Sequence, residues 1–281
     1  MVTMGFGVPL ALLGVVFWAL ADQVTKFSLD RASKWRVLFL SQLFGGGIIL
    51  AVTMLLGEAD KWLEILPWLI GLGLVNFIGM LTFYEAIKAK GVALTASITN
   101  AYPFITVVLG FLIYKEPVSL HQIIAILLIL AGMFTITLKN GKRLFDRSFL
   151  IALVSMAVWG VLFFILKIPV SIAGALLVTA GLKLATPVAS LPVLFLKKIS
   201  PIETKHKLLA LIAAVGVLDS LGLLAYTFAI KDAPVSTIAP IVAAVPALSV
   251  ILAVVFLKER LSLHQTVGIL AAMAGIFLIS A

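Results

Sequence analysis

Long apolar stretches alternate with short polar connections along the whole chain of 281 residues. Each stretch covers about 20 residues, which is the length that an α-helix needs to cross the hydrocarbon layer of a membrane. The connections are too short to hold an extramembrane domain. We therefore predict ten membrane-spanning helices, at residues 7–28, 35–56, 64–87, 92–114, 119–138, 148–167, 170–196, 208–230, 235–257 and 262–280.

The second half of this pattern repeats the first. Residues 115–122 read KEPVSLHQ and residues 258–265 read KERLSLHQ. At an offset of 143 residues, 76–138 aligns with 219–281, and 24 of the 63 pairs are identical. We therefore predict a duplicated five-helix unit. Its parts are a first repeat, a basic linker and a second repeat, at residues 1–138, 139–147 and 148–281.

The distribution of Lys and Arg predicts how the repeats lie in the membrane. Because five is odd, the second repeat would cross the membrane in the sense opposite to the first. The loop after the first span carries four Lys or Arg residues and its counterpart after the sixth carries one, and the loops after the second and seventh spans reverse this ratio. Basic loops stay cytoplasmic. We expect an inverted repeat in the plasma (inner) membrane, with both termini on the non-cytoplasmic side.

Composition and charge narrow the class of protein further. Hydrophobic residues make up 63% of the chain and charged residues 12%, against roughly 25% charged residues in soluble domains. The net charge of +9 lies in short loop clusters, so we do not interpret it as a nucleic-acid surface. The chain has no cysteine, and its three histidines have no second metal ligand close in sequence. We expect no metal and no cofactor, and no GxxxxGK[ST] sequence indicates direct ATP use.

Ionisable and amide side chains deep inside apolar spans are costly to insert and mark candidate functional sites. Asp219 lies twelve residues from the nearest lysine on either side, which places it near the middle of its span. Asn76 is its counterpart in the first repeat. Lys183 is also in mid-span, with Gln42 as its weak counterpart, and Asp219 is its candidate partner. Hydrogen bonding between helices is the alternative role for these side chains.

Matched prolines and tryptophans indicate the same region. Pro103 and Pro246 interrupt the fourth and ninth spans, and paired helix breaks in two repeats are typical of transporter binding sites. Packing kinks and interfacial anchoring are the alternatives for these prolines and for the tryptophans. The candidate residues for substrate binding or coupling are Asp219, Lys183, Asn76, Asn100, Tyr102, Tyr226, Trp18 and Trp159.

Residues nearer the loops are expected to be structural. Asp22 and Lys26 lie four residues apart, which is the spacing of an ion pair on one helix. Glu116 and Glu259 are expected at the interface, each paired with a neighbouring Lys or Arg. The serine and glutamine of both SLHQ stretches have the spacing of a capping box at a helix start.

The chain resembles the drug/metabolite transporter superfamily, in its ten-helix EamA-type branch. The resemblance is carried by the two repeat-related tryptophans, the paired prolines, the AIK turns at 86–88 and 229–231, and the two SLHQ stretches with their AGMF and AGIF tails. It implies a basket of ten helices around a central cavity that moves metabolites by alternating access. The usual Gly-Glu pair of the family reads Lys-Glu here, and many members have cytoplasmic termini, unlike the orientation that the charges predict.

We therefore expect a secondary transporter, an exporter by resemblance, of an amino acid or a similar small amphipathic metabolite. Asp219 would bind a proton or an ammonium group, and Lys183 would pair with it or bind a carboxylate. The expected partners are the metabolite and membrane lipid, with no nucleic acid, and the chain is a monomer or a homodimer. The alternatives are an intramembrane lipid-processing enzyme, which the scattered histidines disfavour, and an accessory or sensor subunit.

Overall fold

The computed structural model of the chain describes residues 4–115, 120–137, 147–200, 206–242 and 244–280, and the regular structure in these ranges is α-helical. The helices of the first half are α1 (Met4–Leu29), α2 (Lys34–Leu55), α3 (Trp62–Lys90), α4 (Val92–Thr99), α5 (Pro103–Tyr114) and α6 (Leu120–Thr137). Those of the second half are α7 (Arg147–Ile165), α8 (Lys167–Leu196), α9 (His206–Asp232), α10 (Val235–Val242), α11 (Val245–Phe256) and α12 (Leu263–Ser280).

These helices follow the predicted apolar stretches with two differences. The predicted fourth and ninth spans each contain two helices, α4 with α5 and α10 with α11. The boundary between the sixth and seventh spans, predicted at residues 167–170, also lies earlier in the structure, because α7 ends at Ile165. Helix α8 already begins at Lys167, and the backbone turns at Gly174, where φ is +80°.

The surface of the helical bundle is apolar. Leu55, Leu63 and Leu196 are 86%, 78% and 84% exposed, although they lie in different helices. Seven helical segments of the described chain are long and apolar enough to cross a membrane, and α11 and part of α12 are shorter apolar helices. Apolar side chains that surround a bundle are stable against lipid and not against water. The chain is therefore a multi-pass membrane protein.

Glycines bring α2 and α9 into backbone contact. A Cβ atom added at Gly45 would lie 2.2 Å from the carbonyl oxygen of Gly216, and one added at Gly216 would lie 2.0 Å from the carbonyl oxygen of Ser41. Small residues let membrane helices approach closely because no side chain separates their backbones. This contact holds α9, which carries Asp219, against α2, which carries Gln42.

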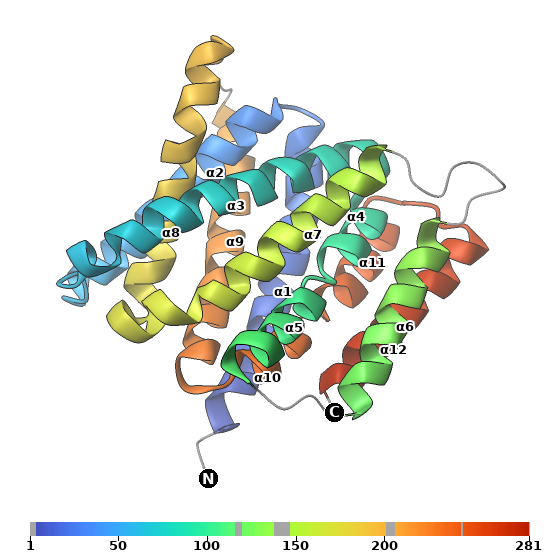
Figure 1. Cartoon of the computed structure of the whole chain (residues 1–281). Helices are drawn as coiled ribbons and strands as arrows, with labels where there is room; N and C mark the ends of the chain where they lie inside the picture. The colour runs from blue at the N-terminus through green and yellow to red at the C-terminus, as the bar shows by residue number, and fades with distance from the viewer. Residues whose placement is uncertain (1–3, 116–119, 138–146, 201–205, 243, 281) are drawn as a thin grey trace.

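The two repeat-related tryptophans pack in the same way in both halves. Trp18 of α1 lies on Gly222 of α9, and Trp159 of α7 lies on Gly79 of α3. Gly79 and Gly222 are themselves 143 residues apart, which is the offset of the repeat. Figure 1 shows α6 and α12 side by side at one edge of the bundle, away from the helices that carry the two tryptophans.

A residue from the second half caps α4 in the first half. Gly91 has φ +81°, a conformation that favours glycine, and α4 begins directly after it. The Glu259 carboxylate accepts hydrogen bonds from the backbone N–H groups of Val92 and Ala93, at 2.7 and 3.0 Å. A negative charge is favourable there because a helix start carries free N–H donors. The described partners of Glu259 are therefore backbone donors and not the Lys or Arg that we expected, and Glu116 lies outside the described residues.

The paired prolines stand at the starts of new helices and not at bends inside continuous ones. Pro103 is the first residue of α5, and Pro246 is the second residue of α11. Proline is tolerated in the first turn of a helix because the N–H group that it lacks would have no acceptor within the helix. The turn between α4 and α5 carries Asn100 and Tyr102.

The variant Gly45→Ala tests the close approach of α2 and α9. Its methyl group would overlap the α9 backbone, so the helices must move apart, and we expect a loss of about 1–3 kcal/mol in the free energy of unfolding. Gly47→Ala is the matched control, because nothing lies within 4 Å of a Cβ atom at Gly47. Thermal unfolding in detergent, followed by circular dichroism, measures the difference. Equal unfolding temperatures for the two variants would contradict the contact.

Candidate functional site

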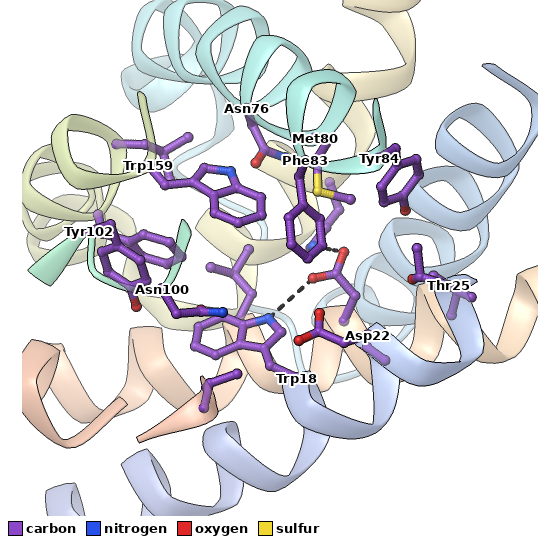
Figure 2. A pocket seen from close by; sticks show the side chains of 18 of the residues that line it. Trp18, Asp22, Thr25, Asn76, Met80, Phe83, Tyr84, Asn100, Tyr102 and Trp159 are labelled. Carbon is purple, nitrogen blue, oxygen red and sulfur yellow. Dashed lines mark hydrogen bonds and ion pairs between the residues drawn. The ribbon is translucent and has the colours of Figure 1, made fainter. Parts of the chain in front are cut away.

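A cavity lies at the centre of the bundle, and residues of α1, α3, α7, α8 and α9 form most of its wall. Its empty volume is about 670 Å³ when the open mouth is included, whereas the space that the centre of a water-sized molecule can occupy is about 60 Å³. Figure 2 shows many of its side chains. The charged, amide and hydroxyl side chains of the wall, apart from tyrosine, are Asp22, Thr25, Asn76, Asn100, Lys183 and Asp219.

Aromatic rings line much of this cavity. Phe163 stacks on Tyr102 with ring centroids 4.5 Å apart, and it meets Trp18 edge to face at 5.6 Å. Phe83 lies 5.0 Å from Trp159. Such pairs give a rigid apolar wall because each ring limits the rotation of its neighbour. The wall therefore suits a ligand with an apolar or aromatic body.

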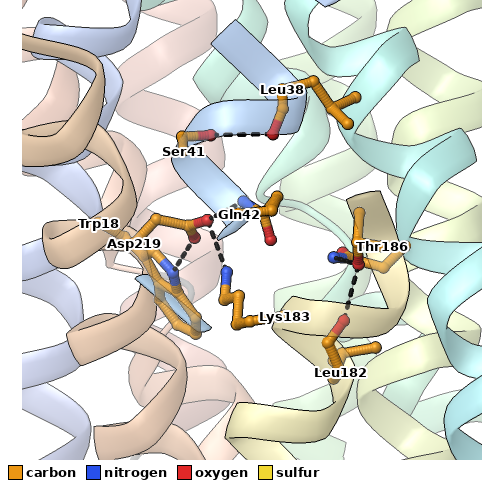
Figure 3. Close-up of polar contacts among 9 residues, drawn as sticks. Trp18, Leu38, Ser41, Gln42, Leu182, Lys183, Thr186 and Asp219 are labelled. Atoms are coloured by element: carbon orange, nitrogen blue, oxygen red, sulfur yellow. Dashed lines mark hydrogen bonds and ion pairs between the residues drawn. The ribbon is translucent and has the colours of Figure 1, made fainter. Parts of the chain in front are cut away.

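Lys183 and Asp219 form an ion pair in the cavity wall. The distance from Lys183 Nζ to Asp219 Oδ2 is 2.5 Å, and the two side chains are 3% and 14% exposed. Gln42 Nε2 donates to the same oxygen at 2.7 Å, and Trp18 Nε1 donates to Oδ1 at 3.2 Å. Figure 3 shows these three donors around one carboxylate. Side chains from α1, α2 and α8 thus converge on a single residue of α9.

This set of contacts determines what Asp219 can do. A charge buried away from water is stable only with a close partner and further hydrogen bonds. Asp219 has both, from Lys183 and from two neutral donors. A ligand cation at this carboxylate would therefore have to share it with three donors that belong to the protein.

The first repeat has an amide at the equivalent position. Asn76 of α3 is 6% exposed, and its Nδ2 donates to Thr186 Oγ1 of α8 at 2.9 Å. Asn76 therefore joins α3 to α8, as Asp219 joins α9 to α2. Both polar groups reach the cavity wall.

The turn between α4 and α5 also reaches the cavity. Asn100 lines it and donates to a carbonyl oxygen of α4 at 3.1 Å. Tyr102 lines it too, and its hydroxyl group has no hydrogen-bond partner among the residues that the structure describes. Tyr226 does not line the cavity. It packs against Trp18 and Phe163 and donates to the Phe163 carbonyl oxygen at 3.3 Å. Of the predicted binding residues, Tyr226 is the one placed outside the wall.

Asp22 is the cavity residue that sequence reasoning placed wrongly. It is 7% exposed, lines the cavity, and accepts a hydrogen bond from Ser249 Oγ at 2.7 Å. Lys26, its expected partner, pairs instead with Asp30 at 2.8 Å. Asp22 lies one turn after Trp18 on the same face of α1, and this spacing is the signal that the sequence offers. Within the described ranges, no group of three or more His, Cys, Asp or Glu residues could hold a metal ion.

Comparison with known proteins identifies relatives of the chain. The sequence profile of the EamA-like transporter family matches residues 5–138 and again residues 147–281. An "Uncharacterized transporter" of Archaeoglobus fulgidus is 24% identical over 208 residues, which cover 72% of this chain and 71% of that protein. Another "Uncharacterized transporter", from Methanothermobacter thermautotrophicus, is 28% identical over 138 residues. That match covers 47% of this chain and spans only 39% of the length of the relative.

A solved structure has the same fold. This structure, described as "Crystal structure of protein", superposes with a TM-score of 0.73 over 97% of this chain and 95% of that one. The two sequences are 18% identical. At this level of identity the likeness concerns the arrangement of the helices alone.

The variant Lys183→Met tests the ion pair. It leaves the Asp219 carboxylate without its cation, and we expect a loss of about 3–5 kcal/mol in the free energy of unfolding. The double variant Lys183→Met/Asp219→Asn should recover part of this loss, because it removes both charges of the pair. Thermal unfolding of the wild type, of Lys183→Met, of Asp219→Asn and of the double variant gives the four stabilities of a double-mutant cycle. A double variant whose loss equals the sum of the two single losses would contradict the pairing.

Proposed function

Because this chain belongs to the EamA-like transporter family, we propose that it is a secondary transporter that moves a small metabolite across the membrane by alternating access. One observation carries the proposal. Residues of both halves enclose a central cavity with an aromatic wall and an ion pair in it. Membership of a transporter family also favours a carrier over an enzyme.

The position of the cavity supports alternating access. Its wall takes Trp18 and Asn76 from the first half, and Trp159 and Asp219 from the second. In transporters built from repeats, the substrate binds where the repeats meet, and one repeat moves against the other around it. We propose that the ten predicted spans form two inverted five-helix repeats, and the reversal of Lys and Arg counts between equivalent loops supports this arrangement.

The chemistry of the wall supports a small amphipathic substrate. Aromatic rings would contact its apolar part, and the amides of Asn76 and Asn100 would bind its polar part. Amino acids and related compounds are one class of this kind. We propose export as the direction of transport, on family resemblance, and coupling to protons, on the presence of Asp22 and Asp219 in the wall.

Counterflow in proteoliposomes tests the function. Vesicles are loaded with an unlabelled compound, and uptake of the same labelled compound is followed for an aromatic amine, an amino acid, a sugar and an organic anion. We expect protein-dependent uptake of one class, which an imposed pH gradient changes if protons are coupled. If vesicles with folded protein take up no compound of these four classes, the proposed transport of a small amphipathic metabolite is wrong.

The variant Ala21→Phe should stop this transport by filling the cavity. Ala21 lies in the wall and is 4% exposed, so a benzyl group at this position would occupy the space of the substrate. We expect the initial rate of counterflow to fall by about tenfold or more, which corresponds to roughly 1.4 kcal/mol. Leu20→Phe is the matched control, because the neighbouring Leu20 is 37% exposed on the outer face of α1. Elution in gel filtration verifies that both variants fold, and equal transport by both would place the substrate path elsewhere.

A further inference from the structure

We propose that Asp22 binds the positively charged group of the substrate, and that this substrate is an organic amine without a free carboxylate. The inference rests on the proposed transport function and names the substrate class of the same cavity. It follows from the charge of the wall, from an oxygen of Asp22 to which none of the described residues donates, and from the aromatic rings around it.

The charges of the cavity wall do not balance. Its charged residues, among those that the structure describes, are Asp22, Lys183 and Asp219. Lys183 and Asp219 neutralise each other at 2.5 Å. Asp22 has no Lys or Arg within ion-pair distance in the described part of the chain, and Lys26 on the same helix is paired with Asp30. Buried charges are normally paired, so the wall has one carboxylate for which a ligand can supply the cation.

Asp22 is oriented by a hydrogen bond to one of its oxygens, and its other oxygen can still accept hydrogen bonds from a ligand. Its Oδ2 accepts from Ser249 Oγ at 2.7 Å, while its Oδ1 receives no hydrogen bond from the described residues. Ser249 is fixed in turn, because its carbonyl oxygen accepts from Gln23 Nε2 at 3.1 Å. An ionised carboxylate has room for about four hydrogen bonds. Figure 2 shows Asp22 between Trp18 and Thr25, facing the cavity.

The rings around Asp22 suit a cation as well as an apolar body. Trp18 lies one turn before Asp22 on α1, and Tyr84 and Phe83 reach the cavity from α3. Aromatic faces attract cations, and tryptophan attracts them most strongly. An ammonium group at Asp22 would therefore lie beside the indole of Trp18. The rest of the molecule would lie against Phe83 and Trp159, whose ring centroids are 5.0 Å apart.

A substrate carboxylate has no equivalent place in this wall. The cation that could bind it is Lys183, which Asp219 already holds at 2.5 Å. A carboxylate at Lys183 would break that ion pair and leave Asp219 buried without its cation. The wall therefore favours an amine over the corresponding amino acid, and this narrows the substrate class given above.

Ligand binding to the wild-type protein tests the charge requirement without any mutation. We would titrate purified protein in detergent with phenethylamine, with the neutral 2-phenylethanol and with phenylalanine, and follow the tryptophan emission, since Trp18 and Trp159 line the cavity. Phenethylamine should bind about 10- to 100-fold more tightly than either comparison compound, as expected for a hydrogen-bonded charge. Equal binding of phenethylamine and 2-phenylethanol would overturn the proposal, and so would tighter binding of phenylalanine.

The variant Asp22→Asn locates the cation. It keeps the shape of the side chain and removes its charge, and we expect phenethylamine to bind about 10- to 100-fold more weakly. Asp30→Asn is the matched control, because it removes a carboxylate that follows α1 directly and pairs with Lys26 outside the cavity. Asp22→Glu keeps the charge and should bind more tightly than Asp22→Asn. Unchanged affinity in a folded Asp22→Asn protein would overturn the proposal.

Counterflow separates the two proposals. If wild-type vesicles carry phenethylamine and the Asp22→Asn vesicles do not, both stand. If the Asp22→Asn variant carries phenethylamine at the wild-type rate, the transport function stands and the role of Asp22 is wrong. If wild-type protein binds phenethylamine through Asp22 but carries out counterflow of none of the four compound classes, the binding site stands and the transport function is wrong.

Discussion

An ion pair buried at the crossing of several helices is the constraint on which the central site depends. Moving a charge out of water costs several kcal/mol, and only a close partner with further hydrogen bonds offsets that cost. Lys183 supplies the partner of Asp219, and Gln42 and Trp18 supply the hydrogen bonds. Four helices must therefore keep their relative positions within hydrogen-bonding tolerance. Gly45 also helps to position these groups, because the lack of a side chain there lets α2 approach α9 closely enough for Gln42 to reach Asp219.

The two carboxylates of the cavity thus have different surroundings. Asp219 is surrounded by donors that belong to the protein, and its position is a consequence of packing. Among the described residues, one hydroxyl group donates to Asp22, and the side chain lies in the wall of the cavity with the aromatic rings. Asp219, which the sequence marks most clearly by its position in mid-span, is therefore the carboxylate with more hydrogen-bond donors among the described residues.

The position of a residue along its span could be predicted from sequence, and so could the pairing of Lys183 with Asp219. Most other contacts between helices could not. The lengths of the apolar stretches placed the helices closely, and the distance from the ends of a span singled out Asp219 and Lys183. For Asp22 the local spacing rule chose a neighbour on its own helix, yet its partner Ser249 is 227 residues away. Tyr226 lies on the same helix face as Asp219, but Trp18 and Phe163 fill the space in front of it. Such contacts depend on which helix faces meet, and periodicity within one helix contains no information about its neighbours.

The repeats have diverged where they matter most for the cavity. Gln42 and Asn76 in the first half stand where Lys183 and Asp219 stand in the second, so one half contributes amides and the other an ion pair. A dimer of identical five-helix subunits would carry either two such ion pairs or none. Two halves of different sequence are free of that restriction, because a residue can change in one half and stay unchanged in the other. The cavity of this chain can therefore carry one ion pair on one side and neutral amides on the other.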